Sequence, residues 1–185
     1  DAPQLIKEAL EQFLSRNSLK DDKVAVSVSG ESGLARYFKP PPVDVKKIAD
    51  IVKYEARQQI PFALEDVIWD YQRLPGGQEV EGFALDTEIG LFAMKREQVD
   101  KALAPYNAAE IEVDVIQLAP IALYNYVAHD VSKGLPEGQD YDSESPPPSI
   151  VVLSIGTDTT DLVVTNGFRV WQRNIPLGGN HFTKQ

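Results

Sequence analysis

Two apolar runs joined by a short polar turn constrain the fold of this chain more than any other feature. The runs are 150–153 and 162–164, and the turn between them, 156–161, consists of glycine, hydroxyl and carboxylate residues. A continuous apolar run of this length predicts a strand that is covered on both faces. The Asn166-Gly167 pair then predicts a second tight turn, which leads to a third strand at 168–175.

The polar turn has the residue types that can hold a phosphate. A glycine followed by hydroxyl residues can direct backbone N–H groups and hydroxyls at phosphate oxygens. The same residues are common in ordinary β-turns, so local sequence alone favours a turn without a ligand. Two carboxylates here, Asp158 and Asp161, could bind a metal, although such side chains more often cap local N–H groups or face solvent. The candidate phosphate-binding residues are Ser154, Gly156, Thr157, Asp158, Thr159 and Thr160.

Charge and composition exclude several classes of function. The chain has 185 residues, a net charge of −10 and a sequence pI of about 4.7. Nucleic acids and anionic membranes are bound by clustered lysine and arginine, so we expect neither as a ligand. No apolar stretch approaches the ~20 residues that cross a bilayer, which argues against direct membrane insertion. The absence of cysteine excludes disulfides and thiolate metal sites.

The rest of the chain predicts helices and strands in mixed order, hence an α/β (α+β) fold. Helices are expected at 3–17, 45–59 (capped by Asp44), 97–106 and 120–128, and another is expected to open at Asn180. Strands are expected at 23–29, 34–39, 67–74, 83–94 and 111–116, and a polar loop at 130–149. Because the chain lacks an initial Met and stops in an opening helix, we expect a fragment of a longer protein.

Four cations follow one another along the second predicted helix. They could bind an acidic partner, but a solvated helix face paired with Asp50 and Glu55 is the more common arrangement. The four residues are Lys46, Lys47, Lys53 and Arg57.

Histidine and tryptophan offer no catalytic constellation. The two histidines, His129 and His181, are far apart and neither belongs to a ligand-spaced cluster, so we expect both at the surface. Trp69 and Trp171 are expected to be packing residues.

Several spaced motifs resemble the type IV pilus assembly protein PilM family, which belongs to the actin-like ATPase superfamily and is related to the cell-division protein FtsA. The first is Arg36-Tyr-Phe-Lys-Pro-Pro-Pro-Val43, and the second is the helix that ends in Ile60-Pro61-Phe62. The third is Ile175-Pro-Leu-Gly-Gly-Asn180, which follows the hairpin. The resemblance rests on the order of these motifs, and it covers essentially the whole chain.

The resemblance implies a fragment of an actin-like ATPase fold with an inserted small α+β subdomain. The subdomain would be residues 23–94, while 1–22 and 95–185 would belong to the actin-like core. The hairpin 150–164 would be the second phosphate-binding segment.

The resemblance also implies a function. The family is a cytoplasmic scaffold, peripheral to the inner membrane, that binds ATP with Mg between two lobes. It holds the N-terminal tail of the membrane protein PilN in a groove between the inserted subdomain and the core. We expect Ile60, Pro61 and Phe62 to border that groove, the alternative being a helix stop with Phe62 packed in the subdomain core.

One departure from the superfamily pattern argues against catalysis. Members usually carry Asp-x-Gly at the second phosphate segment, whereas this chain has Ser154-Ile155-Gly156. A neutral hydroxyl cannot replace a carboxylate in holding Mg²⁺ or orienting an attacking water. The family's first phosphate segment and its adenosine-binding segments are absent from the 185 residues, so we expect these residues alone to bind no nucleotide and to contain no catalytic residue.

Two alternatives to a pilus scaffold stay open. One is an ATPase or kinase of the actin-like superfamily, with at most weak ATPase activity in the parent protein. The other is a degenerate, nucleotide-free interaction module of a related secretion machine, which the serine at position 154 favours.

Overall fold

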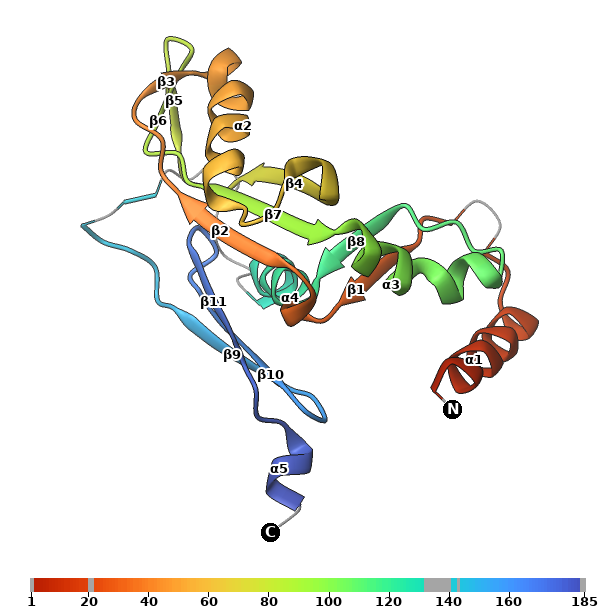
Figure 1. Cartoon of the computed structure of the whole chain (residues 1–185). Coiled ribbons are helices and arrows are strands. Elements are labelled where there is room, and N and C mark those ends of the chain that lie inside the picture. The colour runs from red at the N-terminus through yellow and green to blue at the C-terminus, as the bar shows by residue number, and fades with distance from the viewer. Residues whose placement is uncertain (1, 20–21, 132–140, 143, 184–185) are drawn as a thin grey trace.

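The computed structural model describes residues 2–19, 22–131, 141–142 and 144–183. Its elements form two groups, an upper one around α2 and a lower one that contains both termini (Figure 1). Of the predicted polar loop 130–149, residues 132–140 and 143 lie outside the described residues. The described helices include none that is both long and apolar enough to cross a membrane.

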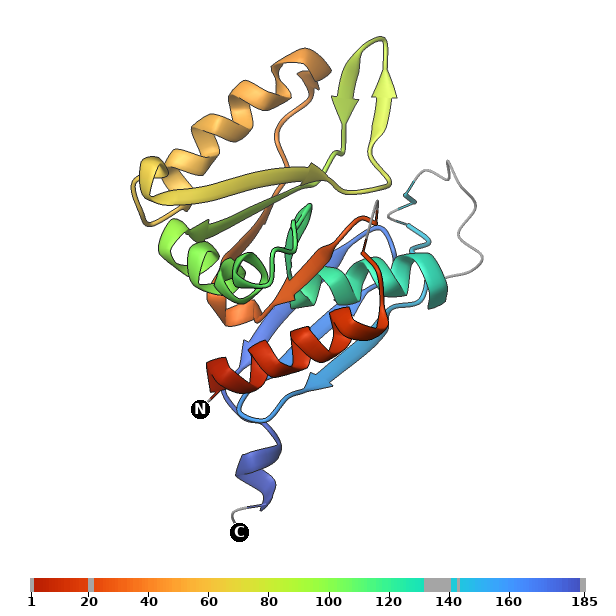
Figure 2. The same ribbon diagram turned by 90° about the vertical axis from the view of Figure 1, so that its right-hand side faces the viewer.

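The upper group is built on an antiparallel sheet with the strand order β2-β7-β4. These strands are β2 (Leu34–Phe38), β7 (Ile89–Lys95) and β4 (Val67–Arg73). Helix α2 (Ile48–Gln59) lies over this sheet (Figure 2). Its apolar side packs against the central strand because residues at helical spacing face one direction. The buried core residues are Ile48, Val52, Ala56, Ile60, Val67, Ala84, Ile89, Leu91 and Ala93.

The start of α2 confirms the predicted cap. The Asp44 carboxylate accepts a hydrogen bond of 2.9 Å from the backbone N–H of Lys46. The first turn, Val45–Lys47, is a 3-10 helix, and the α-helix proper follows it. Ile60 donates its N–H to the carbonyl of Ala56, and the following proline ends the helix.

The single long strand predicted at 83–94 is wrong, because the chain breaks at Asp86. Its φ of +50° lies in the left-handed region, which interrupts a strand. The break separates β7 from β6 (Phe83–Leu85). Strand β6 instead belongs to a small antiparallel sheet with β3 (Val43–Asp44) and β5 (Gln78–Val80).

The lower group contains a parallel pair, β1 (Ala25–Val28) beside β8 (Val115–Leu118). The strand predicted at 111–116 is therefore displaced toward the C-terminus, because Asp114 anchors the preceding loop. Its carboxylate accepts the N–H of Val24 at 2.9 Å, and its own N–H donates to the Val24 carbonyl. The predicted division into 1–22, 23–94 and 95–185 stays a prediction.

The helices of the lower group are close to their predicted positions. Helix α1 (Ala2–Arg16) lies near α3 (Arg96–Ala108), and α4 (Ala119–Tyr126) lies against both β8 and the hairpin layer. A five-residue π-helical segment, Val127–Val131, continues from α4.

The three-stranded hairpin layer is confirmed, with the order β11-β10-β9. The strands are β9 (Ile150–Ile155), β10 (Thr160–Thr165) and β11 (Val170–Ile175), and a short helix, α5 (Gly179–Thr183), follows them. The helix thus begins one residue before the predicted Asn180.

The expected coverage of the first hairpin strand on both faces is wrong. Strand β9 lies at the edge of its layer, and Val151, Leu153 and Ile155 on its outer face are each more than half exposed. No element within the described ranges covers that face.

A buried junction connects the upper group to the hairpin layer. Glu88, just before β7, accepts a 2.7 Å ion-paired hydrogen bond from Arg169, just before β11. Beside this pair, the hydroxyl of Tyr124 donates to the carbonyl of Gly167 at 2.9 Å, and burial raises the pKa of Tyr124 to about 12. Leu74 from the upper group packs here as well, in a core cluster with residues of β10 and β11. These contacts fix the position of the upper sheet relative to the hairpin layer.

We expect Glu88→Gln to destabilise the protein by about 1–3 kcal/mol, because it leaves the half-buried Arg169 guanidinium without a charged partner. Urea unfolding of the intact protein measures the change. Glu79→Gln is the matched control, since Glu79 pairs with Arg73 at 4.0 Å on the surface, and such pairs contribute about 0–1 kcal/mol. Equal losses in the two variants would contradict a special role for the junction.

Candidate functional site

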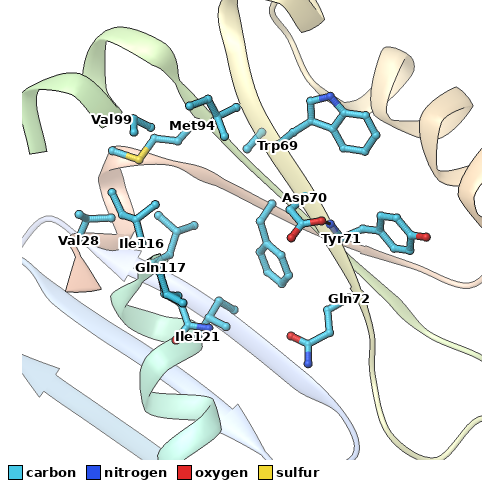
Figure 3. A pocket seen from close by; sticks show the side chains of 15 residues that line it. Val28, Trp69, Asp70, Tyr71, Gln72, Met94, Val99, Ile116, Gln117 and Ile121 are labelled. Carbon is cyan, nitrogen blue, oxygen red and sulfur yellow. Dashed lines mark hydrogen bonds between the residues drawn. The ribbon is translucent and has the colours of Figure 1, made fainter. Parts of the chain in front are cut away.

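A groove of about 220 Å³ lies between the two groups, bordered on one side by β4 and on the other by β8 and α4 (Figure 3). Alternate residues of β4 point to opposite faces of the strand. Asp70 and Gln72 point to the side of Ile116 and Gln117, while Tyr71 points away (Figure 3). Apolar side chains dominate the rest of the lining: Val28, Ile68, Phe92, Met94, Val99, Val115 and Ile121. Trp69, Ala93 and Leu118 complete the lining, and we call the surface that all these residues line the groove.

Each wall of the groove includes a strand that lies at the edge of its sheet. Among the described strands, β4 pairs only with β7 and β8 pairs only with β1. An edge strand has unpaired backbone N–H and C=O groups, which can pair with an added extended peptide. The groove therefore has the backbone geometry to receive an extended segment.

The polar groups of the groove indicate which side chains a bound segment would have. Asp70 is the one carboxylate among the lining residues, and its Oδ1 accepts the N–H of Tyr71 at 2.8 Å. The Gln117 side-chain carbonyl accepts from Asn125 at 3.3 Å. An apolar groove with a single carboxylate suits a peptide with apolar side chains and one cationic group.

The predicted partner-binding residues lie outside the groove lining. Ile60 is only 4% exposed and belongs to the core of the upper group, whereas Pro61 is exposed. Phe62 is 45% exposed, so the alternative that packs it in the core is wrong. The Lys95 ammonium lies 4.2 Å from the centroid of the Phe62 ring, a cation–π distance. A role for these residues in partner binding stays a prediction.

The predicted phosphate turn is held closely by its own backbone and by the start of α5. Gly156 donates its N–H to Thr159 at 2.9 Å, which closes the turn. The N–H groups of Gly179 and Asn180 donate to the carbonyls of Gly156 and Thr157 at 2.8 and 2.9 Å. The Asn180 amide also donates to the Asp158 carboxylate at 3.0 Å. The first amides of α5 are thereby used within the protein.

The six candidate phosphate residues differ in what they can offer a ligand. Ser154, Gly156, Thr157 and Asp158 are exposed and lie together at this end of the hairpin. Thr159 is half-buried, and Thr160 is buried with its hydroxyl donating to the Leu177 carbonyl at 2.6 Å. The exposed hydroxyls and the exposed carboxylate are therefore the groups that a phosphate or Mg²⁺ in solution can reach.

The carboxylate that pairs in register with Ser154 is buried, and a ligand in solution cannot reach it. Asp161 pairs with Ser154 across β9 and β10, but it is only 8% exposed and accepts the Asn174 amide at 2.9 Å. Its Oδ1 also lies against Gly30, where an added Cβ would come within 2.6 Å. Across the described part of the chain, no group of three or more His, Asp or Glu residues is placed to hold a metal ion. The exposed hydroxyls of the turn could donate to phosphate oxygens, and Asp158 is its single exposed carboxylate.

Three further predictions concern single side chains. His129 and His181 are both exposed, which confirms their surface position. Trp69 packs against the core of the upper group, which confirms its predicted packing role. Trp171 is 51% exposed, so its predicted packing role is wrong, because its side of β11 faces outward.

Sequence reasoning assigned no residue of the groove to ligand binding. The available signal was the alternation in β4, where Ile68, Asp70 and Gln72 share one face. Only the tertiary arrangement shows that this face lies opposite β8.

We expect Gly178→Ala to destabilise the protein by about 1–3 kcal/mol, as overpacking does. The added Cβ would lie 2.6 Å from the backbone of Thr157 and Asp158, so the turn must move. Gly179→Ala is the matched control, because its Cβ would meet nothing closer than 3.6 Å. Urea unfolding of both variants measures the difference, and amide chemical shifts of the turn show whether it moves. If Gly178→Ala changed neither the free energy of unfolding nor the chemical shifts of the turn, close docking of α5 on the turn would be contradicted.

We compared the sequence and the fold of the whole chain with those of known proteins. A family model for the type IV pilus assembly protein PilM matches residues 2–185. No curated protein matches the sequence.

Two solved structures resemble the fold. A chain of a PilM-PilN type IV pilus biogenesis complex matches with a TM-score of 0.73 and 22% identity, over 98% of this chain and 51% of that one. The cytoplasmic domain of EpsL, an inner-membrane component of the type II secretion system of Vibrio cholerae, matches with a TM-score of 0.52 and 14% identity. That match covers 91% of this chain and 56% of the EpsL domain. The chain thus spans about half the length of the solved proteins it matches.

Proposed function

Because the chain belongs to the family of the type IV pilus assembly protein PilM, we propose that it is part of a cytoplasmic scaffold that holds the tail of an inner-membrane partner. The family match confirms the resemblance predicted from the spaced motifs. The structural match confirms the mixed α/β, actin-like fold. The partner is a PilN-like protein, and its N-terminal tail occupies the groove.

The groove between two edge strands is the observation that carries this proposal. An extended tail can add backbone hydrogen bonds to β4 or β8 while its apolar side chains fill the space beside Phe92, Met94 and Ile121. A cationic group of the tail, such as an α-amino group, lysine or arginine, pairs with Asp70. The matched complex contains PilM and PilN, which supports the choice of partner.

This mode of binding implies where in the cell the protein is located. A scaffold that grips the cytoplasmic tail of a membrane protein is peripheral to the inner membrane through that partner. The net charge of −10 supports attachment through a partner rather than through anionic lipid headgroups.

We expect Ile68→Asp to weaken binding of the tail at least about tenfold, because it places a carboxylate on the apolar wall of the groove. A synthetic peptide of the partner's N-terminal tail, titrated into the intact protein by calorimetry, measures the affinity. Val80→Asp is the matched control, since Val80 is similarly exposed but lies on β5, outside the groove lining. Absence of binding by the unaltered protein, or equal loss in both variants, would contradict the proposal.

A nucleotide is the second ligand that we propose for the intact protein. The exposed hydroxyls of Thr157 and Ser154 and the carboxylate of Asp158 would face the phosphates of ATP or its Mg²⁺ ion. Bound ATP-Mg would provide a ligand that can link two lobes. Because Ser154 is neutral and Asp161 is engaged by Asn174, these residues support binding and positioning rather than hydrolysis.

We expect Gly178→Ala to weaken binding of a fluorescent ATP analogue in the presence of Mg²⁺, because it displaces the turn, while Gly179→Ala leaves binding unchanged. Fluorescence titration of the intact protein measures both. Binding that is absent from the unaltered protein would favour the nucleotide-free interaction module. Steady release of phosphate that Ser154→Ala abolishes would favour the ATPase or kinase alternative.

A further inference from the structure

A second hollow, of about 530 Å³, lies beside the C-terminal end of α2 and the segment that follows it. We call the following set the basic hollow: Lys53, Arg57, Phe62, Leu64, Glu65 and Trp69. Trp69 also borders the groove, whereas the other five residues do not line it. A ligand of the basic hollow would therefore contact mostly other residues than the tail that we propose for the groove, with Trp69 in common.

Two cations stand on one side of the basic hollow without a partner in the described chain. Lys53 and Arg57 are four residues apart on α2, so they share one helix face, and both are exposed. Neither forms an ion pair with any described carboxylate. The predicted pairing of the cations of this helix with Asp50 and Glu55 is therefore wrong. The Glu55 carboxylate instead accepts the Gln59 amide at 2.8 Å.

The floor of the basic hollow is apolar and fixed in place. Trp69 and Leu64 pack against the core of the upper group, and both are only partly exposed. Phe62 is 45% exposed, and the Lys95 ammonium lies 4.2 Å from its ring centroid. Arg96 donates to the backbone carbonyl of Glu65 at 2.8 Å, which anchors the same segment. A fixed aromatic floor beside cations can bind an apolar side chain at low entropic cost.

The charge of the basic hollow indicates what covers it. Lys53 and Arg57 outnumber its single carboxylate, Glu65, in a chain whose net charge is −10. Arginine binds carboxylates through two parallel hydrogen bonds, which lysine cannot do. Glu65 repels a second carboxylate on its own side, so acidic groups of a ligand must lie on the α2 side.

We propose that the basic hollow binds an acidic segment of a partner protein, in which an aromatic side chain lies between carboxylate residues. The aromatic side chain contacts Phe62, Leu64 and Trp69, and the carboxylates pair with Arg57 and Lys53. A lipid surface fits less well, because the hollow is concave and the chain as a whole is acidic.

A fluorescein-labelled peptide of eight residues, with one Phe between two Glu and small polar residues elsewhere, tests this proposal against the intact protein. Fluorescence anisotropy measures binding. Two matched peptides replace both Glu by Gln, or the Phe by Ala. We expect each replacement to weaken binding at least about fivefold, because charged hydrogen bonds and buried aromatic anchors dominate such contacts.

The variant K53Q/R57Q locates the site. We expect it to weaken binding of the acidic peptide about tenfold and to remove most of the salt dependence. The control K46Q/K47Q removes the same charge at the start of α2, outside the hollow, and should leave binding unchanged. Both pairs are exposed, so neither variant is expected to disturb folding.

Three outcomes would overturn the proposal: no binding of the acidic peptide to the unaltered protein, equal loss in the two double variants, or equal binding of the Gln peptide. A parallel sedimentation assay uses vesicles of phosphatidylglycerol and phosphatidylethanolamine. Vesicle binding that is lost in K53Q/R57Q, together with no peptide binding, would assign the hollow to anionic lipid instead.

Discussion

The ion pair between Glu88 and Arg169 is the contact on which the arrangement of the two groups depends. Its partners lie 81 residues apart, and each stands just before a strand, so the pair fixes two strand starts at once. The Arg169 guanidinium also lies 4.5 Å from the centroid of the Tyr141 ring. Desolvation offsets much of the attraction in a pair that is largely removed from water, so the net contribution of such a pair to stability is small. The groove needs a defined geometry, since its walls belong to different sheets.

The junction and the groove are related through the short break at Asp86. Had residues 83–94 continued as one strand, Glu88 would lie within a regular ladder, with β4 and β2 on either side. The left-handed conformation of Asp86 instead ends β6 and lets the chain turn into β7. The main sheet then starts beside Arg169 and runs to the groove, where Met94 lines the wall. A local backbone feature thus influences where the distant groove lies.

Local signals in the sequence predicted the helices well because they depend on neighbours a few residues apart. The cap at Asp44, the stop at Pro61 and the Asn166-Gly167 turn are of this kind. The short strands β3 and β5 could not be predicted, because segments of two or three residues become strands only when β6 lies beside them. The groove is nonlocal in the same sense, since it joins β4 to a strand more than 40 residues later. For the same reason, the apolar run of β9 predicted coverage that its edge position does not provide.

Strand β4 separates the two surfaces that we propose as binding sites. Its alternation places Asp70 and Gln72 toward the groove and Trp69 and Tyr71 toward α2, so each face has its own chemistry. The groove combines apolar walls with one carboxylate, whereas the basic hollow combines an aromatic floor with two cations. Ligands of opposite charge are therefore directed to opposite sides of the same strand. On the two proposals above, the partner segments contact different residues of the chain apart from Trp69, which lines both sites.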